Sequence, residues 1–465
     1  MATERRRRQS SNTPKSKRTT SKELAAVGPM TVHNVPDHLL ELILLHLHSS
    51  ACLLRAAATC KRWRRLVAET WFLARFRSLH ATPCIAGNYH AVDPDWIEAE
   101  HGQPLQITGN PVFVPSSSAT VDRRHFSLDF LPDSDTGWEI ADSRGSLLLV
   151  FKRRATTSTW ASGARTRSHF SLPDLVICEP LTRRFQGILR PADVTTYCLG
   201  VFLLDGYHNA DGTGSRIGTS NFRIVAIVNA YNALVEPGRS TPVACVFTSG
   251  SDDNDGWRVL PRTSKPNSVV TIPDPDEIDS ISLVGRANGS IYWVITGEDR
   301  TMLVFNEDTA EFSRFLFPAG SFSWGPYVDR RSFRVIGGDD DGALRLIRVI
   351  DNVLKVFVRL HGSEEWMLEK LLRISEATRG LPRHEEGRYI HFHLEALIIA
   401  ANDKFVLMTP QGKTWPFSVD LETMKVEREH ERNNYPGAAY PCELPWPPVF
   451  NACVNEHGSS SRRRR

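Results

Sequence analysis

The sequence contains one short segment whose residue types could bind a metal ion. His391, His393 and Glu395 alternate with apolar residues, so a strand would place their side chains on one face. Imidazole and carboxylate groups are suitable ligands for zinc, iron or nickel. No fourth ligand is identifiable in the sequence, and this alternation is typical of the polar face of an ordinary strand. We therefore predict no metal site at this segment.

Two further polar segments resemble calcium-binding loops only in part. Residues 338–342 are acidic but lack the alternating acids that such a loop needs. Residues 251–256 come closer, but Ser251 stands at the first position and Arg262 occupies the position of the required glutamate. The sequence has no pattern typical of serine hydrolases, zinc proteases or phosphate-binding loops. The sequence therefore predicts no catalytic residues and no cofactor.

Basic residues are concentrated at the two ends of the 465-residue chain. Residues 1–28 carry a net charge of +6 and residues 462–465 add +4, whereas the formal net charge of the whole chain is +3. The rest of the chain therefore carries −7, which gives no reason to expect that it binds nucleic acid. The tails at 1–28 and 456–465 contain few apolar residues, and we predict that both are disordered.

The N-terminal tail contains two basic clusters separated by a polar spacer. The clusters comprise Arg5, Arg6, Arg7, Arg8, Lys15, Lys17 and Arg18. This spacing is typical of a bipartite nuclear-import signal, although a solvated basic tail has the same composition. We expect the protein in the nucleus, in the cytoplasm or in both.

The apolar residues and cysteines of the chain bear on membrane insertion and on the redox state of its thiols. No segment approaches the roughly 18 consecutive apolar residues that a membrane-spanning helix needs, and we expect no membrane partner. The eight cysteines are scattered and form no Cys-x-x-Cys pair. This pattern favours reduced thiols over a disulfide framework or a zinc site.

Helical periodicity is concentrated between residues 36 and 80. One helix is predicted from apolar residues that share a face: Leu39, Leu40, Ile43, Leu44 and Leu47. Pro36 suits the first turn of that helix. A second helix, from about residue 51 to residue 67, is predicted from a stripe of Leu53, Ala57, Cys60, Arg64 and Val67. A third short helix is predicted over residues 68–78.

Between residues 84 and 455, short apolar runs alternate with turns rich in Gly, Asp, Asn and Pro. Strands are predicted over residues 146–151, 174–178, 222–228, 242–248, 290–295, 302–305, 333–336, 343–349, 353–358, 396–400 and 404–408. Many short strands with little helix indicate an all-β domain. The predicted fold class is α+β multidomain, in which a helical module at 29–80 precedes a β domain at 84–455.

Two turn patterns recur in the β domain. A polar turn with Gly precedes a strand at residues 144–149, 288–293 and 341–346, and more weakly at 402–407. An acidic or amide residue followed three positions later by Thr occurs at residues 178–185, 305–312 and 419–424. The second pattern predicts a hairpin whose turn lies between two buried positions.

The spacing of the first pattern fits a β-propeller. Successive copies lie 53 and 61 residues apart, as expected for four-stranded blades. At about 45 to 60 residues per blade, the domain would form roughly six to eight blades. Two stacked sheets or a pair of β-sandwiches are the alternative.

The helical segment contains several residues at fixed spacing. Pro36 precedes a helix with Leu-Leu and Ile-Leu pairs, and Trp63 lies ten residues after Leu53, at the end of the run Cys-Lys-Arg-Trp. Residues 33–76 resemble the F-box motif, a helical element that docks on a Skp-type adaptor linked to cullin and RING subunits. Four residues depart from those common in that family: Val35, His38, His48 and Thr59. These changes leave the apolar stripe in place.

The resemblance implies that the chain is the substrate receptor of a cullin-based ubiquitin ligase and not an enzyme. It assigns adaptor binding to Pro36, Leu39, Leu40, Ile43, Leu44, Leu47, Leu53, Leu54, Cys60 and Trp63. A small module cannot bury apolar residues on several helix faces by itself, so the remaining face needs a partner. The alternatives are a helical hairpin that only caps the β domain, an F-box scaffold without ubiquitin transfer, and a propeller enzyme or sugar-binding domain.

The β domain resembles the C-terminal domains of a large group of grass F-box proteins. This resemblance rests on residues 200–205, 285–293, 335–342 and 414–424. It implies that the β domain binds a target protein, but it does not identify that target and assigns no site residues in the β domain. Residues 443–448 form a Pro-rich segment with Trp446, which we expect to close the β domain and not to serve as a ligand for an aromatic groove.

Overall fold

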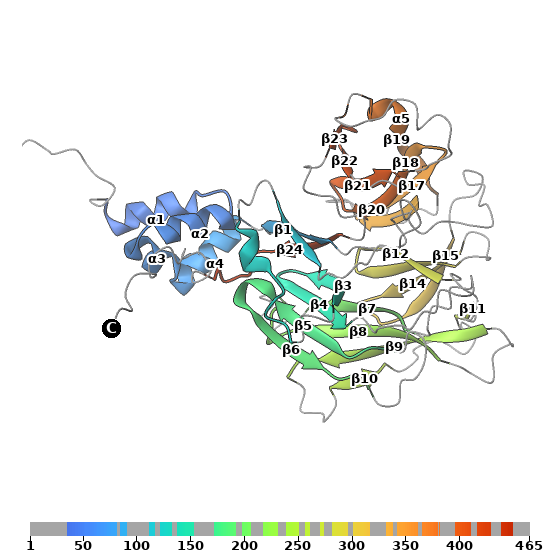
Figure 1. The fold of residues 1–465 in the computed structure, drawn as a ribbon, viewed down its shortest axis with the longest axis horizontal. Coiled ribbons are helices and arrows are strands. Elements are labelled where there is room, and N and C mark those ends of the chain that lie inside the picture. Colours follow the sequence, from blue (N-terminus) through green and yellow to red (C-terminus); the bar gives the residue numbers. More distant parts are fainter. Residues whose placement is uncertain are drawn as a thin grey trace, which may run out of the picture.

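The computed structural model describes most of the predicted elements of the chain (Figure 1). The described residues are 35–80, 84–90, 111–116, 121–132, 137–152, 172–191, 198–205, 217–230, 239–250, 256–260, 270–273, 281–295, 301–316, 332–337, 342–360, 365–379, 381, 396–410, 416–428 and 439–449. Four helices come first, and a large all-β domain follows them.

The helical module has one shared core. Its helices are α1 (Asp37–Leu45), α2 (Ser50–Thr59), α3 (Lys61–Val67) and α4 (Thr70–Leu79). The prediction of one continuous helix from residue 51 to residue 67 is wrong. The backbone of Cys60 is extended, with φ −155° and ψ 162°, and this break separates α2 from α3. The change of direction lets Leu66 and Val67 pack against Phe72 in the common core.

Five groups of four consecutive strands form antiparallel meanders. Their bounds are β3 (Trp138–Arg144), β4 (Leu147–Lys152), β5 (Leu175–Glu179), β6 (Arg184–Ile188); β7 (Cys198–Leu204), β8 (Arg223–Ala230), β9 (Arg239–Thr248), β10 (Trp257–Val259); β12 (Ile281–Ala287), β13 (Ser290–Ile295), β14 (Thr301–Asn306), β15 (Phe312–Leu316); β16 (Phe333–Gly337), β17 (Leu344–Ile350), β18 (Val353–Arg359), β19 (Met367–Arg373); and β20 (Ala396–Ala401), β21 (Phe405–Pro410), β22 (Phe417–Asp420), β23 (Val426–Arg428). A two-residue strand, β11 (Ile272–Pro273), pairs with β9, and a short helix, α5 (Ile374–Ala377), follows β19. Every strand predicted from the sequence overlaps one of these strands.

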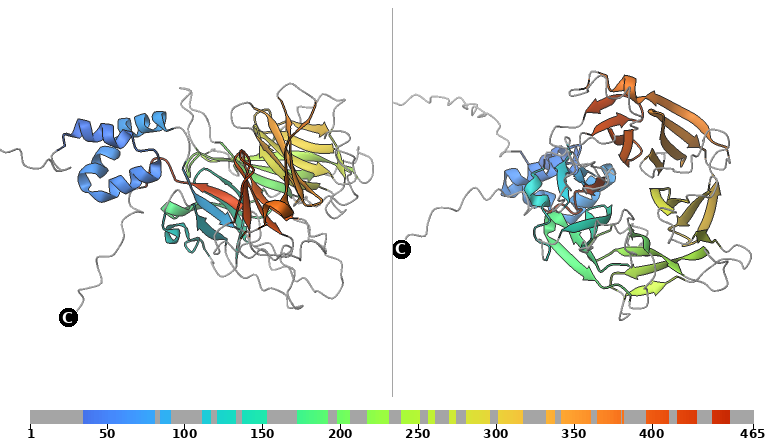
Figure 2. Two further views of the ribbon diagram at one scale, coloured as in Figure 1. Left: turned by 90° about the horizontal axis from the view of Figure 1, so that it is seen from above. Right: turned by 45° about the vertical axis from the view of Figure 1, so that its right-hand side comes forward.

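A sixth sheet joins the two ends of the β domain. It contains β1 (Ile85–His90), β2 (Val112–Pro115) and β24 (Ala439–Glu443), in the order β2-β1-β24. The first strand of each meander contacts the first strand of the next, and β24 contacts both β20 and β3. The five meanders and this three-stranded sheet therefore close into a ring, which Figure 2 shows from the side and along its axis. The predicted propeller is confirmed with six blades, and the sandwich alternative is wrong.

The apolar core of the ring lies between neighbouring blades. Side chains alternate along each strand, so a strand supplies both of its neighbours. On β7, Leu203 packs toward Leu149 of the preceding blade, whereas Phe202 packs toward Trp293 of the following blade. The ring is therefore stabilised by packing of alternate apolar side chains on the two neighbouring blades.

The strand order places the connections on two distinct faces of the ring. Within each meander, the turns between the first and second strands and between the third and fourth strands lie at the same end. We call this end the module face, because Leu444 and Cys84, which lead to the helical module, lie there beside Gly145. Connections on this face include the short turns at 145–146, 288–289 and 402–404. The opposite end is called the far face.

The second recurring turn pattern has a clear physical cause. The Oδ1 atom of Asp420 accepts a hydrogen bond from the backbone N–H of Thr423 at 2.6 Å, and Asn306 accepts one from Thr309 at 2.8 Å. The residue that follows each Thr adopts a positive φ. The prediction that both flanking positions are buried is wrong in part, because Phe185 lies on an outermost strand and is 48% exposed.

Candidate functional site

Helix α1 presents three aliphatic side chains to solvent. Leu39, Leu42 and Ile43 lie at positions i, i+3 and i+4, and are 45%, 46% and 54% exposed. On the other side of the helix, Leu40 and Leu44 are buried in the module core. Helix α1 is therefore apolar on two sides, and only one of them is covered within the described residues. We call Leu39, Leu42 and Ile43 the α1 strip.

The ends of α1 are fixed to the rest of the module. Arg62 of α3 donates a hydrogen bond from Nε to Oδ1 of Asp37 at 2.8 Å and another to the carbonyl of Val35. At the end of α4, the Nε2 atom of His80 lies 2.9 Å from the carbonyl of Leu45. These contacts hold the α1 strip in one orientation relative to the other three helices.

The structure divides the residues that the F-box resemblance assigned to adaptor binding. Three of them are exposed, namely Pro36, Leu39 and Ile43, and three are half-buried, namely Leu47, Cys60 and Trp63. The other four are buried, namely Leu40, Leu44, Leu53 and Leu54. These four fill the interior of the folded chain, so they support the exposed residues and do not form the surface themselves.

Leu54 has a further neighbour that the sequence did not indicate. It packs, together with Ala51, in a cluster that contains Ala86 of β1 and Cys442 of β24. One side of α2 is therefore covered by the β domain. The predicted alternative of a helical hairpin that only caps the β domain explains this side of α2, but it leaves the α1 strip uncovered.

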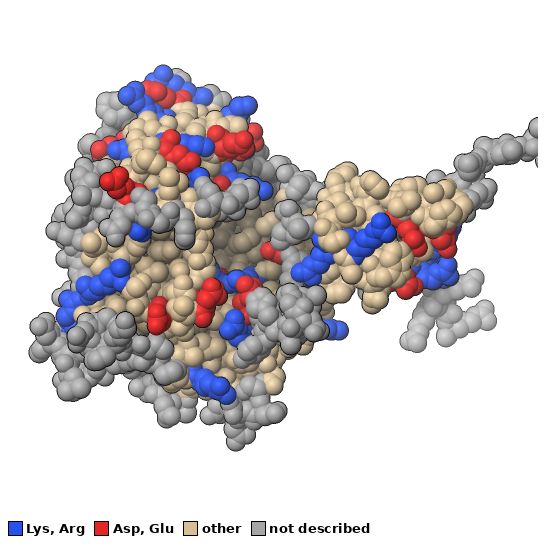
Figure 3. Space-filling model, turned by 180° about the vertical axis from the view of Figure 1, so that it is seen from behind, with Lys and Arg blue, Asp and Glu red and all other residues tan. Residues whose placement is uncertain are grey.

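Three exposed apolar residues of the module, Leu42, Trp71 and Leu79, were missing from the predicted adaptor-binding residues. Leu42 lies three positions after Leu39 and one before Ile43, so helical spacing could have placed it on the same strip. Trp71 of α4 is 46% exposed. Figure 3 shows a broad uncharged area on the helical module, with its charged side chains gathered along the lower side.

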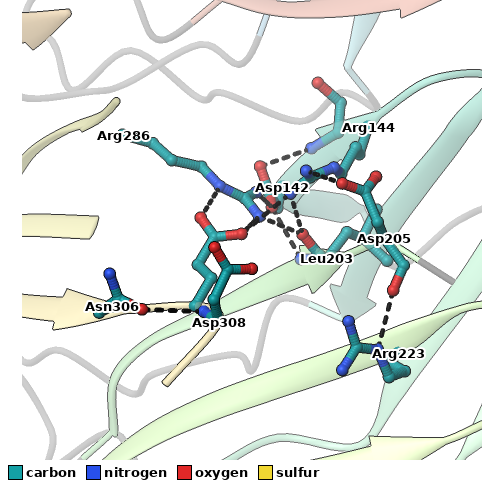
Figure 4. A network of polar contacts seen from close by, with 10 residues as sticks. Asp142, Arg144, Leu203, Asp205, Arg223, Arg286, Asn306 and Asp308 are labelled. Atoms are coloured by element: carbon teal, nitrogen blue, oxygen red, sulfur yellow. Dashed lines mark hydrogen bonds and ion pairs between the residues drawn. The ribbon is translucent and has the colours of Figure 1, made fainter. Parts of the chain in front are cut away.

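The β domain contains a network of charged residues that joins three blades (Figure 4). Arg286 on β12 donates from Nε and Nη2 to the two carboxylate oxygens of Glu307 at 2.5 and 2.6 Å. Its Nη1 atom lies 3.3 Å from Oδ2 of Asp142 on β3. The Glu307 side chain is only 8% exposed, so these bonds compensate a carboxylate that is largely removed from water.

The same network extends toward the surface of the module face. Arg144 donates to Glu307 at 3.2 Å, forms an ion pair with Asp205, and donates to the carbonyl of Leu203 at 3.2 Å. The backbone N–H of Leu203 donates to Asp142 at 2.8 Å. Strands β3, β7 and β12 are therefore tied together near the ring axis.

The two buried carboxyl groups of the network titrate differently. Burial raises the pKa of Asp142 above its usual value, and this effect outweighs the opposing charge of Arg286. Burial also opposes ionisation of Glu307, but hydrogen bonds and charge from Arg286 outweigh it and lower the pKa of Glu307. Shifted groups of this kind are often found at active sites. Here Oδ2 of Asp142 is bonded to Leu203 and Arg286, and Oε2 of Glu307 to Arg144, so each carboxylate links different blades, which is the arrangement of a structural clasp.

A cavity of about 290 Å³ lies between the second and third blades on the module face. Its apolar lining includes Leu204, Val246 and Phe305, and its polar lining includes Thr248 and Asp308. The cavity is small and mixed in character, and it ends at the charged network.

Several sequence predictions fall on residues outside the described part of the chain. These are the histidine segment 391–395, the acidic residues 338–341, residues 251–255 of the second calcium-loop candidate, and both basic tails with Arg5–Arg8, Lys15, Lys17 and Arg18. Among the described residues, no group of three metal-binding side chains gathers in one place. In the same ranges, no helix has the length and apolar character needed to cross a bilayer.

The F-box-like family model matches residues 32–79, which include all four helices. No curated protein matches the chain. Among solved structures, YCF48 from Cyanidioschyzon merolae is 12% identical over 70% of this chain and 77% of its own, with a TM-score of 0.34. A streptogramin B lyase structure is 10% identical over 78% of this chain and 98% of its own, with a TM-score of 0.32. The β-propeller domain of Cps50 (Swd1) from Myceliophteria thermophila is 10% identical over 63% and 72%, with a TM-score of 0.30.

These structural likenesses are weak, whereas the strand order and ring closure of the β domain are themselves those of a β-propeller. The chain carries an F-box-like domain at residues 32–79, followed by a six-bladed β-propeller.

Proposed function

We propose that the chain is the substrate receptor of a cullin-based ubiquitin ligase. The helical module would dock on a Skp-type adaptor, which links to cullin and RING subunits, and the propeller would hold a target protein. Such a receptor makes and breaks no bonds. It raises the effective concentration of target lysines near a ubiquitin-charged enzyme.

The α1 strip is the observation that carries this proposal. Leu39, Leu42 and Ile43 are adjacent aliphatic side chains on a helix that is otherwise well packed, and they belong to a segment that matches the F-box-like family model. Single exposed apolar residues are common on protein surfaces, but a contiguous strip on a helix suits a helix-in-groove partner.

Co-purification of the full-length chain with a Skp-type adaptor tests the proposal. A variant that combines Leu39→Asp and Ile43→Asp should lose at least about 100-fold in adaptor affinity, because two desolvated contacts are replaced by charges. The matched control combines Leu189→Asp and Val259→Asp, two residues of the β domain that are 79% and 64% exposed. The control should bind like the wild type. Full adaptor binding by the first variant would refute the proposal.

We place target binding on the far face of the propeller. Strand ends on that face are joined by long connections, among them 91–111, 153–174 and 374–395. Long surface connections on a rigid scaffold commonly carry binding residues. Replacing 153–171 by a Gly-Ser linker of equal length should reduce target capture in cells and leave adaptor binding unchanged. The same replacement at 206–216, which connects β7 with β8, is the control.

Nuclear import by the N-terminal tail is also part of the proposal. Replacing Arg5–Arg8, Lys15, Lys17 and Arg18 by Ala should shift the protein toward the cytoplasm, as measured by fluorescence of a fusion protein.

A further inference from the structure

Residues 439–446 contribute to two regions of the molecule. Strand β24 pairs with β1 from Ala439 to Glu443 and contacts β3 and β20. At its end, the backbone N–H of Glu443 donates to the carbonyl of Gly145 at 2.8 Å, and Leu444 donates to Cys84 at 2.9 Å. These bonds close the ring, so the closing role predicted for residues 443–448 holds for Glu443 and Leu444 but is wrong for Trp446.

Two residues beyond Leu444, the same segment reaches the helical module. Trp446 packs against the module core, and its ring stacks on that of Phe76 of α4 with centroids 6.0 Å apart and planes inclined by 16°. On its other side, Phe76 contacts His80, with ring centroids 4.3 Å apart. A residue near the C-terminal end of the sequence therefore completes the core of helices that begin at residue 37.

A second contact area lies beside this one. Ala51 and Leu54 of α2 share a buried cluster with Ala86, Cys442 and Leu444 of the β domain. The module is thus held at α2 and at α4, in addition to its covalent connection through residues 81–83. A single covalent connection would not fix the orientation of the module, but packing at two separate helices does.

We propose that residues 439–446 act as a strap that couples closure of the propeller to placement of the helical module, and that Trp446 is the positioning residue of this strap. The α1 strip is then presented from a fixed place on the module face. This coupling is a property of the chain alone, and only its consequence for adaptor geometry rests on the proposed function.

Hydrogen exchange of the full-length chain, without any adaptor, tests the strap. In Trp446→Ala, amides of α2 and α4 should exchange about tenfold faster, because a ring stack and its burial are lost, while β13 and β17 keep their protection. Trp446→Phe keeps an aromatic ring and should restore most of the protection. Trp257→Ala, which removes a half-buried Trp of the second blade, is the matched control and should leave α4 unchanged.

Unchanged exchange of α2 and α4 in Trp446→Ala would overturn the proposal, as would an equal increase over all strands. If that variant does not fold, small-angle scattering of Trp446→Leu replaces it. A greater maximum dimension than in the wild type is expected, and an identical scattering profile would overturn the strap. Because no adaptor takes part, failure of the proposed docking function would leave all these measurements as they are.

Discussion

The charged network of the propeller and the α1 strip of the helical module differ in whether their side chains have partners within the described residues. The propeller pairs even its buried charges, so that Glu307, at 8% exposure, is bonded to Arg286 and Arg144. The helical module has a buried core of its own, but it leaves the aliphatic residues of the α1 strip exposed to solvent. The difference indicates that the charged network is satisfied within the described residues, whereas the α1 strip is a surface that another polypeptide can cover.

The largest expected effect tests which leucines belong to the module core. Leu53 is fully buried, and Leu53→Ala should lower the free energy of unfolding of the module by about 3 to 4 kcal/mol, because it leaves a cavity. Denaturant unfolding followed by helical circular dichroism measures this change. Adaptor binding should be lost together with helicity. A variant with intact helices and no adaptor binding would place Leu53 on the docking surface and weaken the comparison.

The charged network provides the next largest effect. Glu307→Gln should destabilise the propeller by about 2 to 3 kcal/mol, because Arg286 and Arg144 lose a buried ionic partner. Since the folded-state pKa of Glu307 is lowered, its stabilisation is present above the unfolded-state pKa and is lost as the pH falls through the folded-state pKa. Denaturant unfolding at neutral and acidic pH measures both effects. The exposed Glu311→Gln is the control and should change stability little.

His90 makes the closing sheet sensitive to pH. Burial lowers the pKa of His90 from 6.5 to about 4, so its neutral form is favoured in the folded state. Stability is therefore full above pH 6.5 and falls between pH 6.5 and pH 4, by about 3 kcal/mol for this group. His90→Gln should remove this part of the pH dependence in denaturant unfolding. The same slope in wild type and variant would show that His90 does not contribute.

The smallest effect on stability is expected on the α1 strip. Leu42→Ala should change the free energy of unfolding by less than about 0.5 kcal/mol, because the side chain is half in water already. Its adaptor affinity, measured by titration calorimetry, should nevertheless fall about tenfold. A large loss of stability in Leu42→Ala would remove the contrast between the two regions.

Much of the propeller could be predicted from local patterns. Its strands follow from alternating apolar runs, and its turns from Asp, Asn and Thr at fixed offsets, because both depend on residues close in sequence. The pairing of β24 with β1 has no local signal, since it joins segments at opposite ends of the β domain. A closing role was therefore expected of residues 443–448, but the strand partner of β24 became visible only in three dimensions.

The helical module shows where prediction from the sequence ends. Its helical character was readable, but which leucines face solvent was not, because Leu39 and Leu40 are chemically identical and differ only in what packs on them. The break at Cys60 was missed because the apolar stripe continues through it. Contact of Leu54 with β1 and of Trp446 with Phe76 depends on tertiary packing alone.

The late position of β24 has a consequence for how the protein is made. A ribosome synthesises β24 and Trp446 after every other strand and helix described here, so the emerging polypeptide carries an open ring and an incomplete helical core. Messages cut short before this point would yield products in which neither region is finished. The finished arrangement of the α1 strip relative to the propeller would thus form only after residues 439–446 have been synthesised.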